Sequence, residues 1–274
     1  MKIIALVDGS IYAHSVCDLA AWAGARLGSG VELLHVLGRR EAGQQDLSGS
    51  LRLGARTALL EELAALDAQR AKLGMQRGRA ILEDGKAVLA GAGVAASTRL
   101  RHGDLLEELG SDFDLIVIGK RGEAANFAKG HLGSNLERIV RGTSVPVPVL
   151  VAARKFAPVS RVLVAFDGGP SALRAVEHIA DSPLYQGLEV TVVTVGDVAG
   201  LAEATQRLTA AGIAAKGLQV AGQPDAALGK LVEKDGFQMV VMGAYGHSRI
   251  RNLIIGSTTT EMIRSVKVPV MLVR

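Results

Sequence analysis

The chain has 274 residues and a mass of 28.5 kDa, about twice the length of a typical single domain. Hydrophobic residues make up 49% of it and charged residues 21%, a composition that excludes a mainly disordered protein. With five Phe, three Tyr and one Trp, the chain has few aromatic residues for stacking on single-stranded nucleic acid. The net charge of +4 divides into +2 on residues 1–154 (19 Lys and Arg against 17 Asp and Glu) and +2 on residues 155–274 (12 against 10). No basic arm for nucleic acid emerges.

Three further observations concern location and cysteine chemistry. The apolar run at the N-terminus reaches Asp8 after five residues, which is too short for a secretory signal peptide. No uncharged run approaches the roughly 18–20 residues of a membrane span. The single cysteine, Cys17, has no partner for an internal disulfide, and we expect it to be a buried, small apolar group. The sequence therefore predicts a cytoplasmic protein with no membrane or nucleic-acid partner and no metal-binding cluster.

The chain contains two copies of one unit. The matching segments are Lys2–Ser10 with Arg161–Gly169 (offset 159), Phe113–Gly119 with Phe237–Gly243 (offset 124), and Gly133–Ser134 with Gly256–Ser257 and Pro146 with Pro269 (both offset 123). The fall in offset means that the first copy carries 35 extra residues before its fourth strand. We predict two domains, residues 1–154 and 160–274. The extra residues should form a Gly-, Gln- and Ser-rich loop near residues 39–50 that leads into a longer helix.

The fold class follows from alternating strand and helix patterns. The strands are short apolar runs without polar alternation, such as Leu115–Ile118 and Met239–Met242, which is typical of strands buried on both faces. Helices of mixed polarity are predicted between them at Val16–Leu27, Leu59–Lys72, Leu105–Leu109, Ala172–Ala180, Leu201–Ala211 and Asp225–Glu233. This alternation predicts an α/β protein with a doubly wound, mostly parallel sheet in each copy.

Each copy ends in an apolar strand that we expect at the edge of its sheet, residues 145–151 and 268–273. Exposed edge strands leave N–H and C=O groups unpaired, so proteins cover or pair them. We predict that the two terminal strands pair with each other and pack the two copies as a pseudo-dimer. We also predict that the whole chain forms a homodimer.

Candidate ligand-binding residues follow the carboxyl ends of the strands, where open α/β sheets bind ligands. An Asp-Gly pair follows the first strand in each copy, at Asp8 and Asp167. The longest pattern follows the fourth strand: Gly243, two residues, Gly246, nine residues, then Gly256-Ser257. Glycines allow backbone amides to approach a ligand, and a helix that begins after Gly-Ser presents free N–H groups to an anion. The pattern predicts a phosphate site at this end of each sheet.

This Gly-x2-Gly-x9-Gly-Ser spacing, with the Asp after the first strand and the closing apolar strand, resembles the universal stress protein family over nearly the whole chain, twice. The resemblance implies Rossmann-like, adenine-nucleotide-binding domains that bind ATP, ADP or AMP, with or without Mg²⁺. In that family the first-strand Asp and the residue after the second strand hold adenosine, and the glycine loop and Ser hold the phosphates. For the second copy this implies Asp167, Val195, Met242, Gly243, Gly246, Gly256, Ser257 and Thr258. For the first copy it implies Asp8, Val36, Ile118, Gly119, Gly122, Gly133, Ser134 and Asn135.

The second copy fits the pattern without a gap, and we predict that it is the better nucleotide site. The first copy has one loop residue too many and carries Lys120, Arg121 and Lys129, so we expect its site to be altered or lost. An alternative interpretation of Asp8 and Asp167 is that each caps the next turn. The fingerprint-like run Gly91–Ala96 follows a helix and precedes a strand, which is the wrong context for a dinucleotide site.

The functional prediction is a nucleotide-dependent sensor or regulator of the stress response. No general base or acidic Mg²⁺ pair stands out in the sequence, so any ATP hydrolysis should be slow, and we predict no catalytic residues. Two alternatives remain open: a slow ATPase or adenylate-transferring enzyme, and a nucleotide-free dimeric scaffold.

Overall fold

The computed structural model describes residues 1–38, 56–123, 133–142, 147–244 and 257–274. The first repeat contains β1 (Ile3–Leu6), α1 (Ala13–Leu27), β2 (Val31–Leu37), α2 (Arg56–Gly91), β3 (Ala96–His102), α3 (Leu105–Leu109), β4 (Leu115–Gly119), α4 (Ser134–Gly142) and β5 (Val149–Ala152). The second contains β6 (Arg161–Ala165), α5 (Pro170–Asp181), the 3₁₀ turn η2 (Pro183–Tyr185), β7 (Glu189–Val195), α6 (Leu201–Ala210), β8 (Ala214–Val220), α7 (Pro224–Asp235), β9 (Met239–Gly243), α8 (Ser257–Ser265) and β10 (Val270–Val273). The alternation confirms the predicted α/β class.

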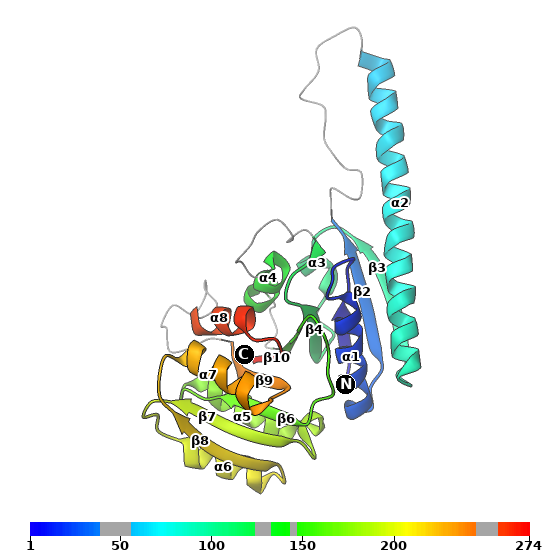
Figure 1. Ribbon diagram of the computed structural model, residues 1–274. Helices are drawn as coiled ribbons and strands as arrows, with labels where there is room; N and C mark the ends of the chain where they lie inside the picture. Colours follow the sequence, from blue (N-terminus) through cyan, green and yellow to red (C-terminus); the bar gives the residue numbers. More distant parts are fainter. Residues whose placement is uncertain (39–55, 124–132, 143–146, 245–256) are drawn as a thin grey trace.

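A single ten-stranded sheet runs through both repeats in the order β3-β2-β1-β4-β5-β10-β9-β6-β7-β8 (Figure 1). All neighbours are parallel except β5 and β10, which pair antiparallel and place Leu150 opposite Met271. Leu150 pairs with Val117 in its own repeat, and Met271 pairs with the equivalent Val241. Leu150 and Met271 are therefore equivalent residues that face each other across a pseudo-twofold axis. The predicted pseudo-dimer is confirmed, and the terminal strands lie at the centre of the joint sheet.

The sheet register corrects one match made from the sequence. Ile116 N donates to Pro148 O at 3.1 Å, and Val240 N donates to Pro269 O at 3.0 Å. Pro148 is therefore the structural equivalent of Pro269, and the predicted match with Pro146 is wrong. Because β5 begins at Val149, both prolines of the first repeat precede the strand, and their missing N–H groups do not interrupt it.

The extra residues of the first repeat lie between β2 and β3, before β4 as predicted. Most of those that the structure describes form α2, whose 36 residues continue to Gly91, far beyond the predicted end at Lys72. Internal glycines disfavour a helix, yet here they allow it to approach the sheet. A Cβ on Gly78 would lie 2.8 Å from Leu100 Cδ1, and one on Gly85 would lie 3.0 Å from Cys17 Sγ.

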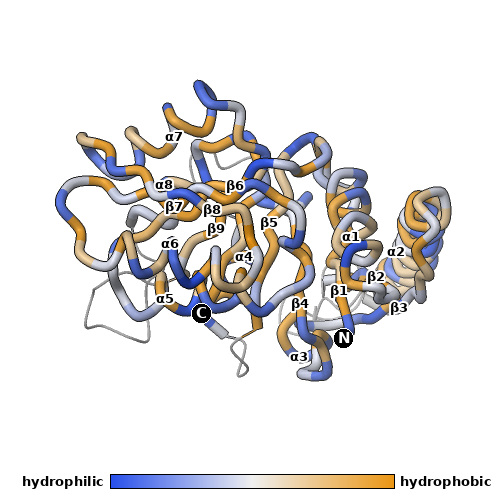
Figure 2. Tube along the Cα trace, turned by 90° about the horizontal axis from the view of Figure 1, so that it is seen from below, coloured by the Kyte–Doolittle hydropathy of each residue, from blue (hydrophilic) through white to orange (hydrophobic). Residues whose placement is uncertain are grey.

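Helices cover both faces of the sheet, and each face buries one hydrophobic cluster that spans the two repeats. Helices α1, α2, α5 and α6 pack on one face, with Leu19, Leu89, Ile179 and Leu208 among the buried residues. Helices α3, α4, α7 and α8 pack on the other, with Leu136 and Ile263 among them. Hydrophobic residues concentrate along the central strands of the sheet (Figure 2). Cys17 is buried, as predicted, and burial raises the pKa of its thiol to about 12.

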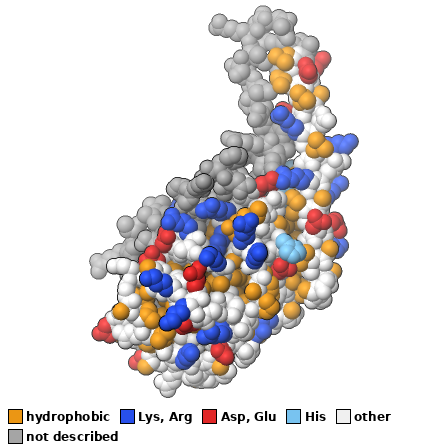
Figure 3. Space-filling view, in the orientation of Figure 1, with side chains coloured by type: hydrophobic (Ala, Val, Ile, Leu, Met, Phe, Trp, Pro, Cys, Tyr) orange, Lys and Arg blue, Asp and Glu red, His pale blue; other side chains and the backbone are white. Residues whose placement is uncertain are grey.

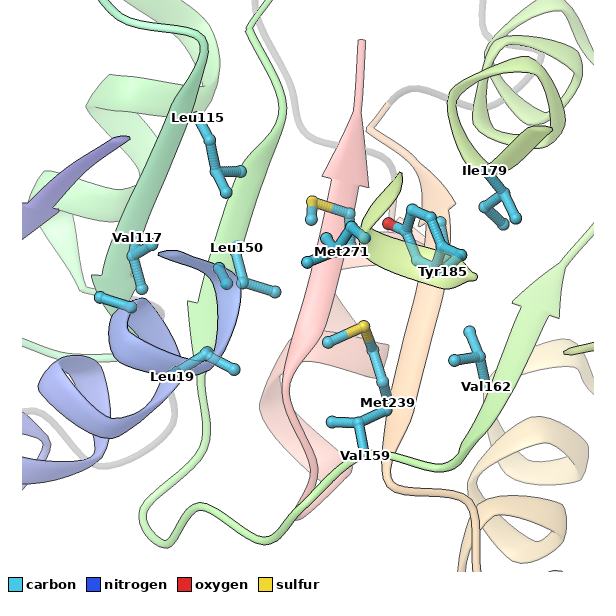
Figure 4. Packing of buried hydrophobic residues seen from close by; sticks show 14 of the residues in the cluster. Leu19, Leu115, Val117, Leu150, Val159, Val162, Ile179, Tyr185, Met239 and Met271 are labelled. Atoms are coloured by element: carbon cyan, nitrogen blue, oxygen red, sulfur yellow. The ribbon is translucent and has the colours of Figure 1, made fainter. Parts of the chain in front are cut away.

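The two repeats share a continuous core at the seam. Figure 4 shows Leu150 and Met271 beside each other on β5 and β10, with Tyr185 of η2 near Met271. Arg26 of α1 crosses between the repeats, and its Nε donates to Leu184 O at 2.7 Å. Within the described residues, no helix combines the length and the apolar character needed to cross a membrane.

Candidate functional site

A cavity of about 210 Å³ opens beyond the carboxyl ends of β1, β2 and β4 in the first repeat. Seven of the eight residues predicted for this repeat line it: Asp8, Val36, Ile118, Gly119, Gly122, Gly133 and Asn135. The eighth, Ser134, begins α4 and is exposed. The structure therefore brings together, in one cavity, residues that are up to 127 positions apart in the sequence.

Asp8 connects the turn after β1 to the glycine loop after β4. Its Oδ1 accepts a hydrogen bond from Ser10 N at 3.0 Å, and its Oδ2 accepts one from Glu123 N at 3.0 Å. In the second repeat, Asp167 Oδ1 accepts from Gly169 N at 2.9 Å. The alternative interpretation that these acids cap the next turn is thus confirmed for both. A carboxylate can accept about four hydrogen bonds, so Asp8 retains acceptor capacity toward the cavity.

The glycines that end β4 and β9 allow close packing of the helix that follows the first strand of each repeat. A Cβ on Gly119 would lie 2.8 Å from Tyr12 Cβ, and one on Gly243 would overlap Ser171. Gly133 has a related role, because its Cβ would lie 3.0 Å from Arg121 Cα and from Lys120 O. These glycines therefore have a structural function whether or not a ligand is bound.

Groups with positive charge or free N–H donors lie on the side of the cavity formed by α4. Helix α4 begins at Ser134, and the N–H groups of its first turn have no partner within the helix, so they can bind an anion. Arg121 and Arg138 also line the cavity. Arg138 Nη2 lies 2.5 Å from Asp104 Oδ2, and this pairing lowers the pKa of the Asp104 carboxyl below its usual value. Asp104 therefore stays ionised and neutralises Arg138.

Sequence reasoning missed Asp104 and Arg138 as residues of the site. Asp104 directly precedes the helix predicted at Leu105–Leu109, and its Oδ1 caps α3 by accepting from Leu106 N at 2.9 Å. The end of β3 brings Asp104 to the cavity, and Arg138 lies one turn after Ser134 on α4. That one-turn spacing was the available signal for Arg138.

Lys120 is not among the residues that line this cavity, whereas Arg121 is. The residue is 7% exposed, and its Nζ donates to Val266 O, just after the end of α8 in the second repeat. Burial lowers the pKa of its ammonium group to about 8. The equivalent residue of the second repeat is the buried Ala244. Lys120 thus joins the glycine loop of the first repeat to the residue that follows α8 in the second repeat.

The second-repeat site is described only in part. Gly246 and Gly256 lie outside the described residues, as does Lys129 in the first repeat. Ser257 begins α8, Thr258 is exposed, Met242 is buried, and Val195 and Gly243 are half-buried. Thr259 Oγ1 lies 3.4 Å from Gly243 O and ties the first turn of α8 to the end of β9.

The universal stress protein family model matches residues 1–151 and 197–274. The chain belongs to the universal stress protein family. Universal stress protein Slr1230 of Synechocystis sp. is 37% identical over 288 aligned residues, which cover 100% of this chain and 99% of that protein. The crystal structure of a universal stress protein from Archaeoglobus fulgidus matches with a TM-score of 0.71 at 22% identity, covering 100% of this chain and 98% of its own. A universal stress protein solved in complex with cAMP matches 43% of this chain and 98% of its own, at 28% identity and a TM-score of 0.38.

Proposed function

We propose that this universal stress protein binds an adenine nucleotide at the carboxyl edge of its sheet and acts as a nucleotide-dependent regulator in the cytoplasm. The observation that carries the proposal is the first-repeat cavity, which gathers seven of the eight residues that the family pattern predicts. The second repeat has the same strand order and the same pattern, so we propose an equivalent site there. We also propose residues 1–154 and 160–274 as the two domains.

The size and lining of the cavity support the placement of the nucleoside inside it and of the phosphates at its mouth. A volume of about 210 Å³ is below the roughly 300–1,000 Å³ of most small-molecule sites, so the cavity suits a nucleoside with phosphates at its mouth. Val36 and Ile118 supply apolar walls for the base. Asp8 can accept hydrogen bonds from the sugar or the base. The phosphates would then lie against the first turn of α4 and Arg121.

The acidic residues at the site favour binding over rapid hydrolysis. Asp8 already accepts two backbone N–H groups, and Asp104 is paired with Arg138. Among the described residues, no group of three or more His, Cys, Asp or Glu side chains could hold a metal ion. Any Mg²⁺ would therefore arrive on the phosphates, because Mg²⁺ is commonly held by phosphates and few carboxylates. Turnover of ATP by the pure protein would instead favour an enzyme.

The test is to place a negative charge where the phosphates are proposed. Asn135→Asp adds an anion to the first turn of α4, where it favours the helix and repels phosphate. We expect ATP affinity at the first-repeat site to fall about tenfold, measured by calorimetry with ATP, ADP and AMP. The control, Gln206→Glu, adds the same charge to an exposed position of α6 and should leave affinity unchanged. Equal effects of both variants, or no nucleotide binding by the wild type, would refute the proposal, and the second result would favour a scaffold.

We further propose that the second repeat binds more tightly, because its loop fits the family spacing without a gap. Gly246→Val should weaken the binding of fluorescent ATP more than Gly122→Val does. Loss of binding in Gly122→Val alone would reverse the ranking.

We also propose a homodimer of the whole chain. Both terminal strands pair within one chain, so a second copy must associate through another surface. Light scattering at micromolar concentration tests this, and a mass of 28.5 kDa would refute it.

A further inference from the structure

A second cavity lies between α2 and the end of β2, and we call it the α2 cavity. Its volume is about 310 Å³, and five of its eight lining residues belong to α2. Helix α2 rises past the carboxyl end of β2, the side of the sheet on which such folds bind ligands (Figure 1). The corresponding helix of the second repeat, α6, has 10 residues against 36 in α2. The α2 cavity is therefore a product of the insertion.

Two arginines and the acid Glu123 line one wall of the α2 cavity, so one arginine charge remains in excess there. Arg70 and Arg77 are seven residues apart, so they lie on the same face of the helix. Arg77 forms an ion pair with Glu123, which reaches it from the glycine loop after β4. Arg70 Nη1 lies 3.8 Å from Asp67 Oδ1, near the outer limit for an ion pair. The contact with Glu123 demonstrates that a carboxylate fits against this wall. Guanidinium groups bind carboxylates and phosphates through two parallel hydrogen bonds, a bidentate geometry.

The remaining lining includes apolar side chains that a ligand could cover. Leu37 is buried at the end of β2, and Ile81 is half-buried on α2. Leu73 is 57% exposed although it borders the cavity. Figure 3 shows that hydrophobic side chains are visible on the surface of the protruding part of α2. An apolar group seated against Leu73 would remove this surface from water, which is favourable.

Three side chains, His35, Arg77 and Glu123, separate the α2 cavity from the first-repeat cavity proposed to bind nucleotide, which we call the nucleotide cavity. His35 lines both, and its Nδ1 is held by donating to Val7 O at 2.8 Å. The ion pair of Arg77 and Glu123 lies over Gly9, because a Cβ on Gly9 would overlap Arg77 Nη2 and lie 2.7 Å from Glu123 Oε2. The two cavities are neighbours, but a ligand can occupy either one alone.

We propose that the α2 cavity is a second ligand site, which binds a small organic anion that carries a short apolar chain. Arg70 and Arg77 bind the carboxylate or phosphate group, and Leu37, Leu73 and Ile81 contact the chain. A neutral molecule of the same length lacks the group that the arginines recognise. The site does not depend on the proposed nucleotide function, because its residues outside His35 do not line the nucleotide cavity.

Calorimetric titration of the full chain with octanoate, octyl phosphate and octan-1-ol tests the proposal. We expect one site per chain for an anion, with octan-1-ol at least tenfold weaker. The relative affinity of octanoate and octyl phosphate then identifies the preferred anionic group. Arg70→Met/Arg77→Met should weaken anion binding at least tenfold. The matched control, Lys72→Met/Arg79→Met, removes two positive charges from exposed positions of α2 that do not line the cavity, and it should change binding less than twofold.

A separate variant and a competition experiment complete the test. Leu73→Ala removes an exposed side chain, which leaves the fold intact, and it should weaken octanoate binding several-fold. ATP added at saturation should not displace octanoate. Equal binding of octan-1-ol and octanoate, equal loss in the control variant, or displacement of octanoate by ATP would each overturn the proposal. If ATP fails to bind while octanoate binds as expected, this inference stands and the nucleotide proposal fails.

Discussion

The two repeats share one backbone plan but differ in the side chains at the carboxyl edge of the sheet. In the first repeat, His35 at the end of β2 holds the backbone of Val7 through its Nδ1. At the equivalent position the second repeat has Thr194, whose buried Oγ1 has no hydrogen-bond partner among the described residues. Likewise Lys120 crosses to the other repeat, whereas its equivalent Ala244 packs in the core. Strands and glycines therefore set the shared fold, while a few residues at the carboxyl edge of the sheet give each repeat its own chemistry.

The two repeats should behave alike at the seam, the antiparallel pair of β5 and β10. Substitutions there should have the largest effect on the free energy of unfolding. Leu150→Ala and Met271→Ala each remove a fully buried side chain, and each should cost about 2–5 kcal/mol of the free energy of unfolding. Since the two residues are equivalent and face each other, the costs should be similar and the double variant non-additive. Urea unfolding of the single and double variants measures this. Additive costs, or two independent unfolding transitions in the wild type, would contradict a shared core.

Lys120 is where the repeats should differ with pH. Burial lowers the pKa of Lys120 to about 8 from 10.5, so between these values the unfolded chain binds the proton more tightly than the folded chain. Stability should therefore rise with pH across this window, by about 3 kcal/mol, relative to Lys120→Met. Chemical unfolding of both proteins from pH 7.5 to 10.5 checks the difference. A constant difference would mean that the ammonium group is not buried in the folded protein.

Ser257 tests the second-repeat site directly. Ser257→Asp places a negative charge at the start of α8, where phosphates are proposed, and it should reduce ATP affinity by of order 1–3 kcal/mol. Fluorescent ATP titration measures the loss, with Gln206→Glu as the charge control. Unchanged affinity would place the phosphates elsewhere.

His178 distinguishes the two repeats at low pH. Burial lowers the pKa of His178 to about 4, although Asp181 opposes this, and the equivalent residue of the first repeat is Leu19. Between pH 6.5 and 4 the unfolded chain takes up a proton that the folded chain does not, so stability should fall as the pH falls. The expected loss is about 3 kcal/mol relative to His178→Leu. Thermal or urea unfolding at pH 4 and 7 would contradict this if both proteins lost stability equally.

Much of the fold was predictable because the strands are apolar runs and the repeat fixes their order. Helix α3 was predicted with the same bounds that it has in the structure, because Asp104 marks its start and its apolar residues are spaced regularly. The length of α2 was not predictable, since its internal glycines suggest a helix end and their role depends on contacts with distant residues such as Leu100 and Cys17. The match of Pro146 failed for a similar reason, because only the sheet register identifies Pro148 as the equivalent residue.

The candidate site was predictable where a residue ends or closely follows its own strand, as Gly119 and Asp8 do. Residues that arrive from a neighbouring element were missed, because the end of β3 and the second turn of α4 meet only in the folded sheet. The family pattern also assigns the glycines to the ligand, whereas the structure shows that Gly119 and Gly243 first accommodate a helix. Sequence spacing alone does not separate these two functions.

The antiparallel seam also determines how the sheet can grow. Pairing β5 with β10 uses up the strands that a single repeat would offer to another subunit, and it leaves β3 and β8 as the outer strands. These strands carry Arg99 and Arg101 on β3 and Lys216 on β8, and charged side chains on outer strands oppose further strand addition. A second chain therefore cannot join the sheet at β5 or β10, and its association requires another surface. A tandem chain of this architecture holds the sheet of two repeats in one polypeptide, so the repeats can differ at their carboxyl edges, as His35 and Thr194 do, while they keep the shared sheet.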